Sequence, residues 1–244
     1  MTQDRTFITG RLDYMYDTPE QRGTKLGFED FSITRFADGR LTQRAFCRIA
    51  RPGLDVERDS VMAVDADWRP TNAFVRIETS GQFTGSAWYT FSKTDAECAA
   101  DTRGEGRVTY RRTLDGPFSF CCHALVGDAW MIAAGDPGKN GARVPWNLLT
   151  STINKSGASG PALAYIPYGI ERVGHETITV AAGTFETIHY RCGRTDGVAD
   201  IVDAPFSYHM WVTDDPYRVC VRSAYPGASK YELAEMTVNE GPVA

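Results

Sequence analysis

Short runs of alternating apolar and polar residues, separated by tight turns, make up most of this chain from Phe28 onward. The clearest example is the stretch 168–192, in which two runs rich in β-branched residues flank the turn 181–184 with Gly183 inside it. Alternation with period two on both sides of a glycine-containing turn is typical of an antiparallel hairpin. The pattern therefore predicts an all-β protein.

The same alternation predicts about 10 to 12 strands along the chain. They are expected at residues 28–36, 40–50, 58–64, 71–79, 86–93, 97–103, 107–113, 168–180, 185–193, 206–213, 217–223 and 231–238. The segment before residue 28 is polar and predicts no strand. Antiparallel strands repeated this often pair into two sheets or close into a barrel, and a barrel of this size holds one small ligand.

One segment interrupts the alternation. Between residues 118 and 134 the apolar side chains recur three and four positions apart, which predicts one helix. Residues 135–161, rich in Gly, Pro and Ser, predict a long loop that acts as a lid or rim. We therefore expect a single domain over residues 1–244, an antiparallel meander forming a β-barrel or half-barrel with one helix and a long loop at 118–161.

Composition and charge narrow the possible partners. The net charge of -5 gives no broad positive field, so nucleic acid and anionic membrane surfaces are poor candidates. The N-terminus lacks an apolar signal core and no run of 18 apolar residues occurs, which predicts a cytoplasmic protein without a membrane span. The six cysteines show no CxxC spacing and are expected to be thiols, with the adjacent pair Cys121 and Cys122 acting as buried apolar side chains. A homodimer is expected only because homodimers are common.

Two C-terminal sequences carry a family resemblance: GHETITVAAGTFETIHYRC and the later YHMWVTDDPYRVCVRSAYPGASKYELAEM. Together they resemble the C-terminal half of bacterial proteins grouped as DUF3108-like domains. The resemblance implies a barrel or half-barrel that accommodates hydrophobic molecules and assigns no catalytic residue. The whole chain also resembles bacterial lyases that release formaldehyde from lignin-derived phenylcoumaran dimers. That resemblance implies a base, a phenolate stabiliser and an apolar pocket.

The predicted strand 71–79 carries the first candidate site. Phe74, Arg76 and Glu78 share one face, while the opposite face is apolar and suited to packing. If the first face lines a cavity, Arg76 binds an anionic group and Glu78 removes a proton, with Phe74 contacting substrate. The alternative is an exposed cross-strand ion pair, which is the commoner arrangement.

Further candidates come from two other predicted strands. His209 and Trp211 share a face, which places a possible general acid or base beside an aromatic ring, although a hydrogen-bonded core histidine is an equal alternative. Tyr110 and Arg112 also share a face, where the cation would stabilise a phenolate. Most tyrosines in β-proteins only pack, so this second pair has a strong structural alternative.

Three further residues are expected to bind substrate if they face inward. They are Arg44, Arg222 and His123. Outward-facing arginines lying over aromatic surface are more common. The four histidines show no metal-ligand spacing, neither glycine-rich turn has the setting of a phosphate loop, and GxSxG is absent, so we expect neither a metal nor a cofactor.

These features favour a cofactor-independent lyase or isomerase that acts on a hydrophobic aromatic or phenolic molecule inside the barrel. In this hypothesis His209 or Glu78 removes a proton, Arg76 or Arg112 stabilises the resulting charge, and Tyr110 acts as acid. Phenolic acid decarboxylases are a precedent at the level of the fold only. The alternative hypotheses are a carrier that binds a hydrophobic ligand without transforming it, and a filled barrel that acts through its surface.

Overall fold

The computed structural model describes residues 5–154, 156–197 and 207–240. Within them one sheet of 15 strands runs in the order β8-β7-β6-β5-β4-β3-β2-β1-β15-β14-β13-β12-β11-β10-β9. The strands are β1 (Arg5–Tyr16), β2 (Lys25–Phe36), β3 (Leu41–Arg51), β4 (Leu54–Val64), β5 (Pro70–Thr79), β6 (Gln82–Phe91), β7 (Asp95–Thr102), β8 (Gly106–Thr113), β9 (Phe118–Cys121), β10 (Arg143–Thr150), β11 (Ala164–Val180), β12 (Gly183–Arg194), β13 (Tyr208–Thr213), β14 (Cys220–Tyr225) and β15 (Ser229–Glu240). Neighbours are antiparallel except β9 and β10, which are parallel.

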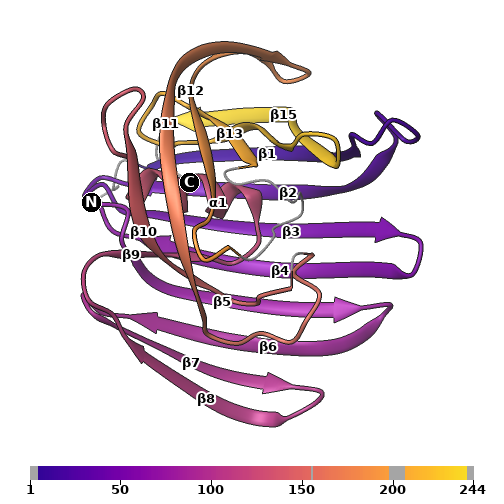
Figure 1. Ribbon diagram of the computed structural model, residues 1–244, viewed down its shortest axis with the longest axis vertical. Helices are drawn as coiled ribbons and strands as arrows, with labels where there is room; N and C mark the ends of the chain where they lie inside the picture. Colours follow the sequence, from indigo (N-terminus) through magenta and orange to yellow (C-terminus); the bar gives the residue numbers. More distant parts are fainter. Residues whose placement is uncertain (1–4, 155, 198–206, 241–244) are drawn as a thin grey trace.

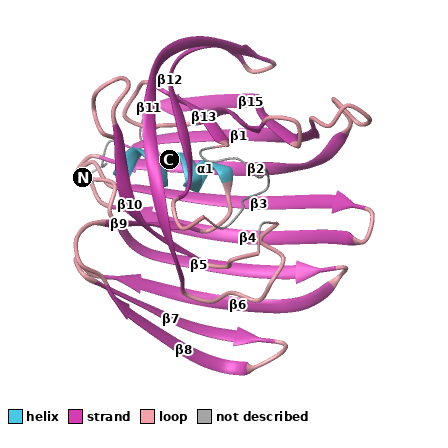
Figure 2. Cartoon of the chain, in the orientation of Figure 1, coloured by secondary structure: helices cyan, strands magenta, loops and turns pink. Residues whose placement is uncertain are grey.

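The sheet curls around a single helix, α1 (Leu125–Ala134), and does not close. Strands β9 to β12 cross the β1–β8 part at a steep angle, and α1 lies between these two parts (Figures 1 and 2). The all-β class and the meander are confirmed, whereas the expected barrel closure is wrong because the edge strands β8 and β9 are not hydrogen-bonded neighbours. The Tyr89 hydroxyl of β6 donates a hydrogen bond to the carbonyl oxygen of Ala162 (3.0 Å), which precedes β11.

The expected strand number is also wrong, because three strands occur where the sequence predicts a polar segment, a helix and a loop. β1 was missed because its alternation is interrupted: Gly10 stands between Ile8 and Leu12 on the inward face, and the outward face carries Phe7 and Met15 among its polar residues. It is held by hydrogen bonds to β2 on one side and β15 on the other. β9 and β10 pair with each other within the segment expected to be helix and loop.

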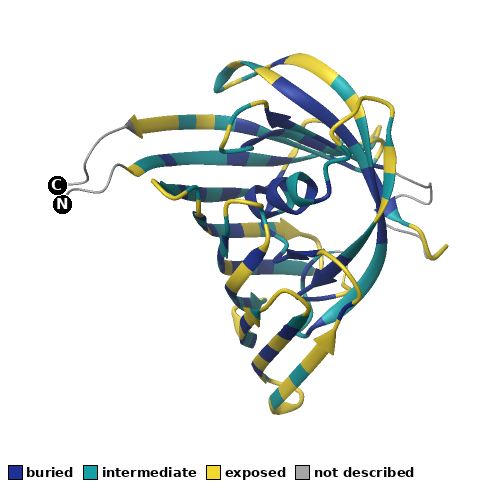
Figure 3. Cartoon of the chain, turned by 90° about the vertical axis from the view of Figure 1, so that its left-hand side faces the viewer, coloured by how far each residue is buried: buried dark blue, intermediate teal, exposed yellow. Residues whose placement is uncertain are grey.

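The helix is shorter than expected because residues 118–121 join the sheet as β9. Its buried side chains include Val126, Ala129, Trp130 and Ile132, which pack into the concave face of the sheet. Figure 3 shows α1 enclosed by buried segments, while exposed residues alternate along the outer side of the strands. Alternation thus divides most strands into an inner and an outer face, although β9 is buried throughout and β8 is largely exposed. The inner face is the one that can surround a ligand.

All six cysteines are buried free thiols, as expected. Among the described residues, no helix has the length and apolar character needed to span a membrane.

Candidate functional site

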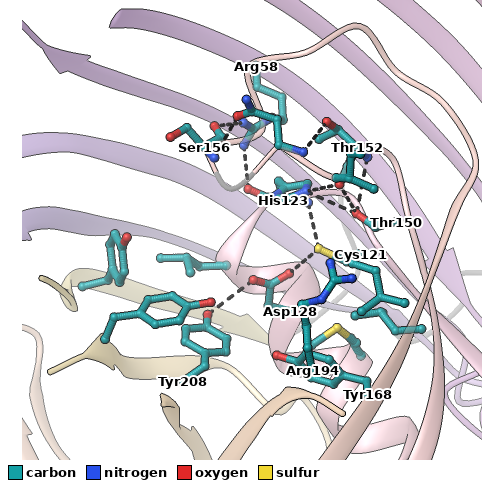
Figure 4. A pocket seen from close by; sticks show the side chains of 18 of the residues that line it. Arg58, Cys121, His123, Asp128, Thr150, Thr152, Ser156, Tyr168, Arg194 and Tyr208 are labelled. Atoms are coloured by element: carbon teal, nitrogen blue, oxygen red, sulfur yellow. Dashed lines mark hydrogen bonds between the residues drawn. The ribbon is translucent and has the colours of Figure 1, made fainter. Parts of the chain in front are cut away.

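A cavity of about 330 Å³ lies between α1 and the concave face, beside residues 152–154 and Ser156. Its walls come from α1, from strands β9 to β15 and from β1, β3 and β4. Small-molecule sites in proteins commonly measure roughly 300–1,000 Å³. The curled sheet and its one helix therefore enclose a space large enough for a small organic molecule (Figure 4).

The helix that forms one wall is fixed by a carboxylate from the sheet. Glu29 of β2 is fully buried and accepts hydrogen bonds from the backbone N–H groups of Leu125 (2.8 Å) and Val126 (3.0 Å). It also accepts one from the Tyr14 hydroxyl (2.6 Å). The first N–H groups of a helix have no partner inside the helix, and a negative charge there is favourable. Glu29 therefore caps the N-terminus of α1 from outside the helix, because the N-cap residue Ala124 has no side-chain acceptor.

Asp128 brings a titratable carboxyl group to the cavity wall. One of its oxygens accepts a hydrogen bond from the Cys121 thiol (3.2 Å), and the other accepts one from the Tyr208 hydroxyl (3.3 Å). Burial raises the pKa of Asp128 to about 7, and the negative charge of Glu29 acts in the same direction. A carboxyl group with such a pKa exchanges protons near neutral pH, as a general acid or base must.

Five tyrosines, Tyr14, Tyr168, Tyr208, Tyr225 and Tyr231, form much of the remaining wall. Tyr208 and Tyr225 stack with ring centroids 4.6 Å apart, and Tyr14 meets Tyr231 edge to face at 4.8 Å. Aromatic rings pair favourably in these two geometries. The wall therefore offers faces and edges to an aromatic ligand, together with the apolar side chains of Leu125, Met131 and Ile166.

Arg58 of β4 lies at the other end of the cavity and is 2% exposed. Its terminal nitrogens donate to the carbonyl oxygens of His123 (2.6 Å), Ser156 (3.0 Å) and Gly157 (3.1 Å), and to the Cys47 sulfur (3.2 Å). A single buried guanidinium thus ties β4 to the start of α1 and to the segment that covers the cavity.

His123 connects β9 to α1 with a φ of 60°, a conformation that is uncommon for a residue other than glycine. Its Nε2 atom lies 3.1 Å from the Thr152 carbonyl oxygen and 3.2 Å from the Thr150 hydroxyl. Because a carbonyl oxygen only accepts, we assign the ring proton to Nε2. Burial lowers the pKa of His123 to about 4, so the ring is neutral at pH 7.

Of the ten residues expected to act in the site, only His123 lines this cavity. Phe74, Arg76 and Glu78 lie on the outer face of β5, where the Arg76 and Glu78 side chains form an ion pair (2.6 Å) and Phe74 packs on Trp88. Arg44 is exposed on the outer face of β3. Arg76 and Glu78 therefore form an outer-face ion pair, here within one strand rather than across strands. Arg44 faces outward, which is the commoner arrangement for such an arginine.

His209, Trp211 and Arg222 do come together, but on the outer face of β13 and β14. His209 Nδ1 lies 3.0 Å from Nε2 of His189, whose Nδ1 is 2.8 Å from the Glu176 carboxylate. Trp211 donates to the same carboxylate (2.8 Å) and stacks on His189, and the Arg222 guanidinium lies 5.9 Å from the Trp211 ring centroid. The cluster is therefore a hydrogen-bonded network outside the cavity.

Tyr110 and Arg112 lie on β8, at one edge of the sheet. The Tyr110 hydroxyl donates to Glu105 (3.1 Å), and the Arg112 guanidinium lies 5.4 Å from the Tyr165 ring centroid. Neither residue lines the cavity. The five expected catalytic residues thus lie in three separate places: Arg76 and Glu78 on β5, His209 on β13, and Tyr110 and Arg112 on β8.

Asp128 was missed, although its setting gave a signal. It is the single charged residue of α1, surrounded in the sequence by Ala129, Trp130, Met131 and Ile132. An acidic residue inside an otherwise apolar helix has to be hydrogen-bonded, exposed or functional. Arg58 gave a weaker signal, because it stands at an inward position of an alternating strand.

The chain matches no family model, and no curated protein matches it. The resemblances to DUF3108-like proteins and to phenylcoumaran lyases are therefore not supported by these comparisons. Among solved structures, it is similar to a β-barrel-like protein of the DUF1849 domain of unknown function from Brucella abortus, with 11% identity, a TM-score of 0.57, and coverage of 97% of this chain and 98% of the other. A DUF1089 family protein from Pseudomonas aeruginosa shows 14% identity and a TM-score of 0.48, over 82% and 89% of the two chains. The first similarity supports the β-barrel-like fold and carries no function.

Within residues 5–154, 156–197 and 207–240, no group of three or more His, Cys, Asp and Glu side chains is placed to hold a metal ion.

Proposed function

We propose that this protein binds a small hydrophobic aromatic or phenolic molecule in the cavity beside α1 and acts on it as a cofactor-independent lyase or isomerase. The observation that carries the proposal is Asp128, a carboxyl group on the cavity wall with a pKa of about 7. The tyrosine-rich wall supports an aromatic substrate. A lignin-derived phenolic dimer is one candidate of this class.

The proposed chemistry is proton transfer by Asp128. Near pH 7 this carboxyl group is present in both forms, so the ionised form can accept a proton from the substrate and the protonated form can return one. The Tyr208 hydroxyl donates to one carboxylate oxygen and holds the group in position. His123, being neutral, contributes a fixed hydrogen-bond donor rather than a second titrating group.

A turnover assay tests this proposal. The purified protein is incubated with a panel of lignin-type phenolic dimers and the products are followed by mass spectrometry. We expect a change of mass for at least one compound, and a loss of rate of about 100-fold or more in Asp128→Asn, in line with the contribution of a general acid or base. Arg76→Ala, on the outer face, is the matched control and should keep the wild-type rate. Turnover that is unchanged in Asp128→Asn would contradict the role given to this residue.

A carrier without turnover is the second candidate, and a specific observation favours it. Most polar groups at the cavity are already occupied by internal hydrogen bonds, Arg58 with backbone carbonyls and His123 with Thr152. A site that only holds its ligand needs no titrating group. Saturable binding of the phenolic panel without any product would support the carrier and remove the enzyme.

A further inference from the structure

The two ends of the cavity differ in chemistry (Figure 4). Arg58, His123, Thr152 and Ser156 gather at one end, and Tyr168, Tyr208 and Arg194 at the other, with Asp128 and Cys121 between them. A ligand with one polar and one aromatic end would therefore bind in one orientation.

The polar end contains the buried positive charge of Arg58, which the negative charge of Glu29 balances at a distance rather than by contact. Among the residues that the structure describes, no carboxylate lies within ion-pair distance of Arg58. Its hydrogen-bond acceptors are carbonyl oxygens and a thiol, which satisfy N–H groups but carry no full charge. The Arg58 Nε atom is buried and has no hydrogen-bond partner within the described part of the chain. Buried charges are normally paired, because an unpaired one loses its hydration without compensation.

The other charged groups around the cavity act on Arg58 without contacting it. Burial opposes the charged form of Arg58, but its pKa is nevertheless raised, and the negative charge of the fully buried Glu29 contributes to this. The Glu29 oxygens themselves are used by the Tyr14 hydroxyl and the helix N–H groups. Asp128 is hydrogen-bonded to Cys121 and Tyr208 rather than to Arg58. Arg194, the second cation on the wall, forms an ion pair with Asp196. Arg58 is therefore the group that a ligand of opposite charge would complement.

We propose that the natural ligand of this cavity is an aromatic carboxylic acid, with its carboxylate at the Arg58 end and its ring among the tyrosines. This inference rests on the proposed function for the aromatic part of the ligand and adds the anionic group. Opposite charges attract strongly in a site from which water is excluded, so the carboxylate contributes affinity and fixes which atoms face Asp128. A neutral molecule of the same shape would lack both effects.

The test compares an acid with its neutral isostere. Ferulate and ferulamide have nearly the same shape and differ in charge, and their dissociation constants are measured by isothermal titration calorimetry at pH 8. We expect wild-type protein to bind ferulate at least tenfold more tightly than ferulamide. Arg58→Met should remove this difference, and Arg58→Lys should keep part of it because the charge remains. Arg44→Met, on the outer face of β3, is the matched control and should keep all of it. Arg194→Met tests the other cation on the cavity wall.

Each outcome is decisive for one of the two proposals. Equal or tighter binding of ferulamide by the wild-type protein would overturn the anionic ligand and leave the aromatic cavity standing. A preference for ferulate that survives Arg58→Met but disappears in Arg194→Met would place the anion at the wrong end and also overturn it. Absence of binding by either compound, or by any member of the phenolic panel, would remove the proposed function itself. Should Arg58→Met not fold, the wild-type ratio and Arg58→Lys still decide the question.

Discussion

Replacing Asp128 by Asn should change how the stability of this protein depends on pH. The carboxyl group has a pKa of about 7 in the folded protein, against an ordinary value of 3.8, because it is buried beside the cavity. Between these two values the folded protein holds a proton that the unfolded chain releases. Stability therefore falls as pH rises through this range, which is the reverse of the behaviour of a carboxylate in a salt bridge.

The size of the effect follows from the two pKa values. From pH 5 to pH 7 the folded state keeps the proton while the unfolded state has lost it, and each pH unit then costs about 1.4 kcal/mol. Two such units give a loss of about 2 to 3 kcal/mol between pH 5 and pH 8. The lower end applies if water in the cavity solvates part of the carboxyl group. Asn has the same shape, can still accept from the Tyr208 hydroxyl and carries no titrating proton.

The assay is urea unfolding followed by tryptophan fluorescence at pH 5, 6, 7 and 8. Other groups, among them Glu29, whose pKa burial also raises, titrate in both proteins, so the difference between wild type and Asp128→Asn isolates the one residue. We expect wild type to lose about 2 to 3 kcal/mol more than the variant between pH 5 and pH 8. Asp67→Asn, an exposed turn residue, is the matched control and should follow wild type. Parallel curves for wild type and Asp128→Asn would refute the reasoning.

Three more predictions follow from the packing. Glu29→Ala leaves the buried Tyr14 hydroxyl and two helix N–H donors without an acceptor, and should lower the free energy of unfolding by about 3 to 5 kcal/mol in urea unfolding. Glu29→Gln keeps one acceptor oxygen and should cost about half as much in the same assay. Gly27→Ala should cost more than about 2 kcal/mol in the same assay, because its Cβ would overlap a backbone carbonyl of β3, while Gly104→Ala meets no atom within 4 Å and should stay within about 0.5 kcal/mol of wild type. Arg76→Ala should leave ligand affinity in calorimetry unchanged, because this side chain lies outside the cavity, and a tenfold loss would contradict that placement.

The strands with alternating apolar and polar residues could be predicted from sequence. The hairpin 168–192, for example, is found as β11 and β12 around the turn at Gly183. β1 could not be recognised in the same way, because Gly10 interrupts its apolar face, Phe7 and Met15 lie on its outward face, and its pairing with β15 joins residues more than 200 positions apart. Barrel closure failed for a related reason: it depends on whether two distant edges meet, and alternation contains no information about that.

The candidate site was harder to predict, because alternation shows which residues share a face but not which face is inside. Arg76 and Glu78 were grouped correctly on β5, and that face is the outer one. His209 and Trp211 were also grouped correctly, and they too lie outside the cavity. Asp128 and Arg58 both line the cavity only because the sheet curls around α1, and local sequence patterns do not encode this curvature.

The proposed function and the proposed anionic ligand both require that the ligand binds in the cavity beside α1. A crystal structure of the protein soaked with the tightest binder of the phenolic and ferulate panels tests this directly. We predict ligand density between α1 and the concave face, with the aromatic ring against Tyr168 and Tyr208 and a polar group toward Arg58. Density at the outer-face network of His189 and His209, with an empty cavity, would contradict the account.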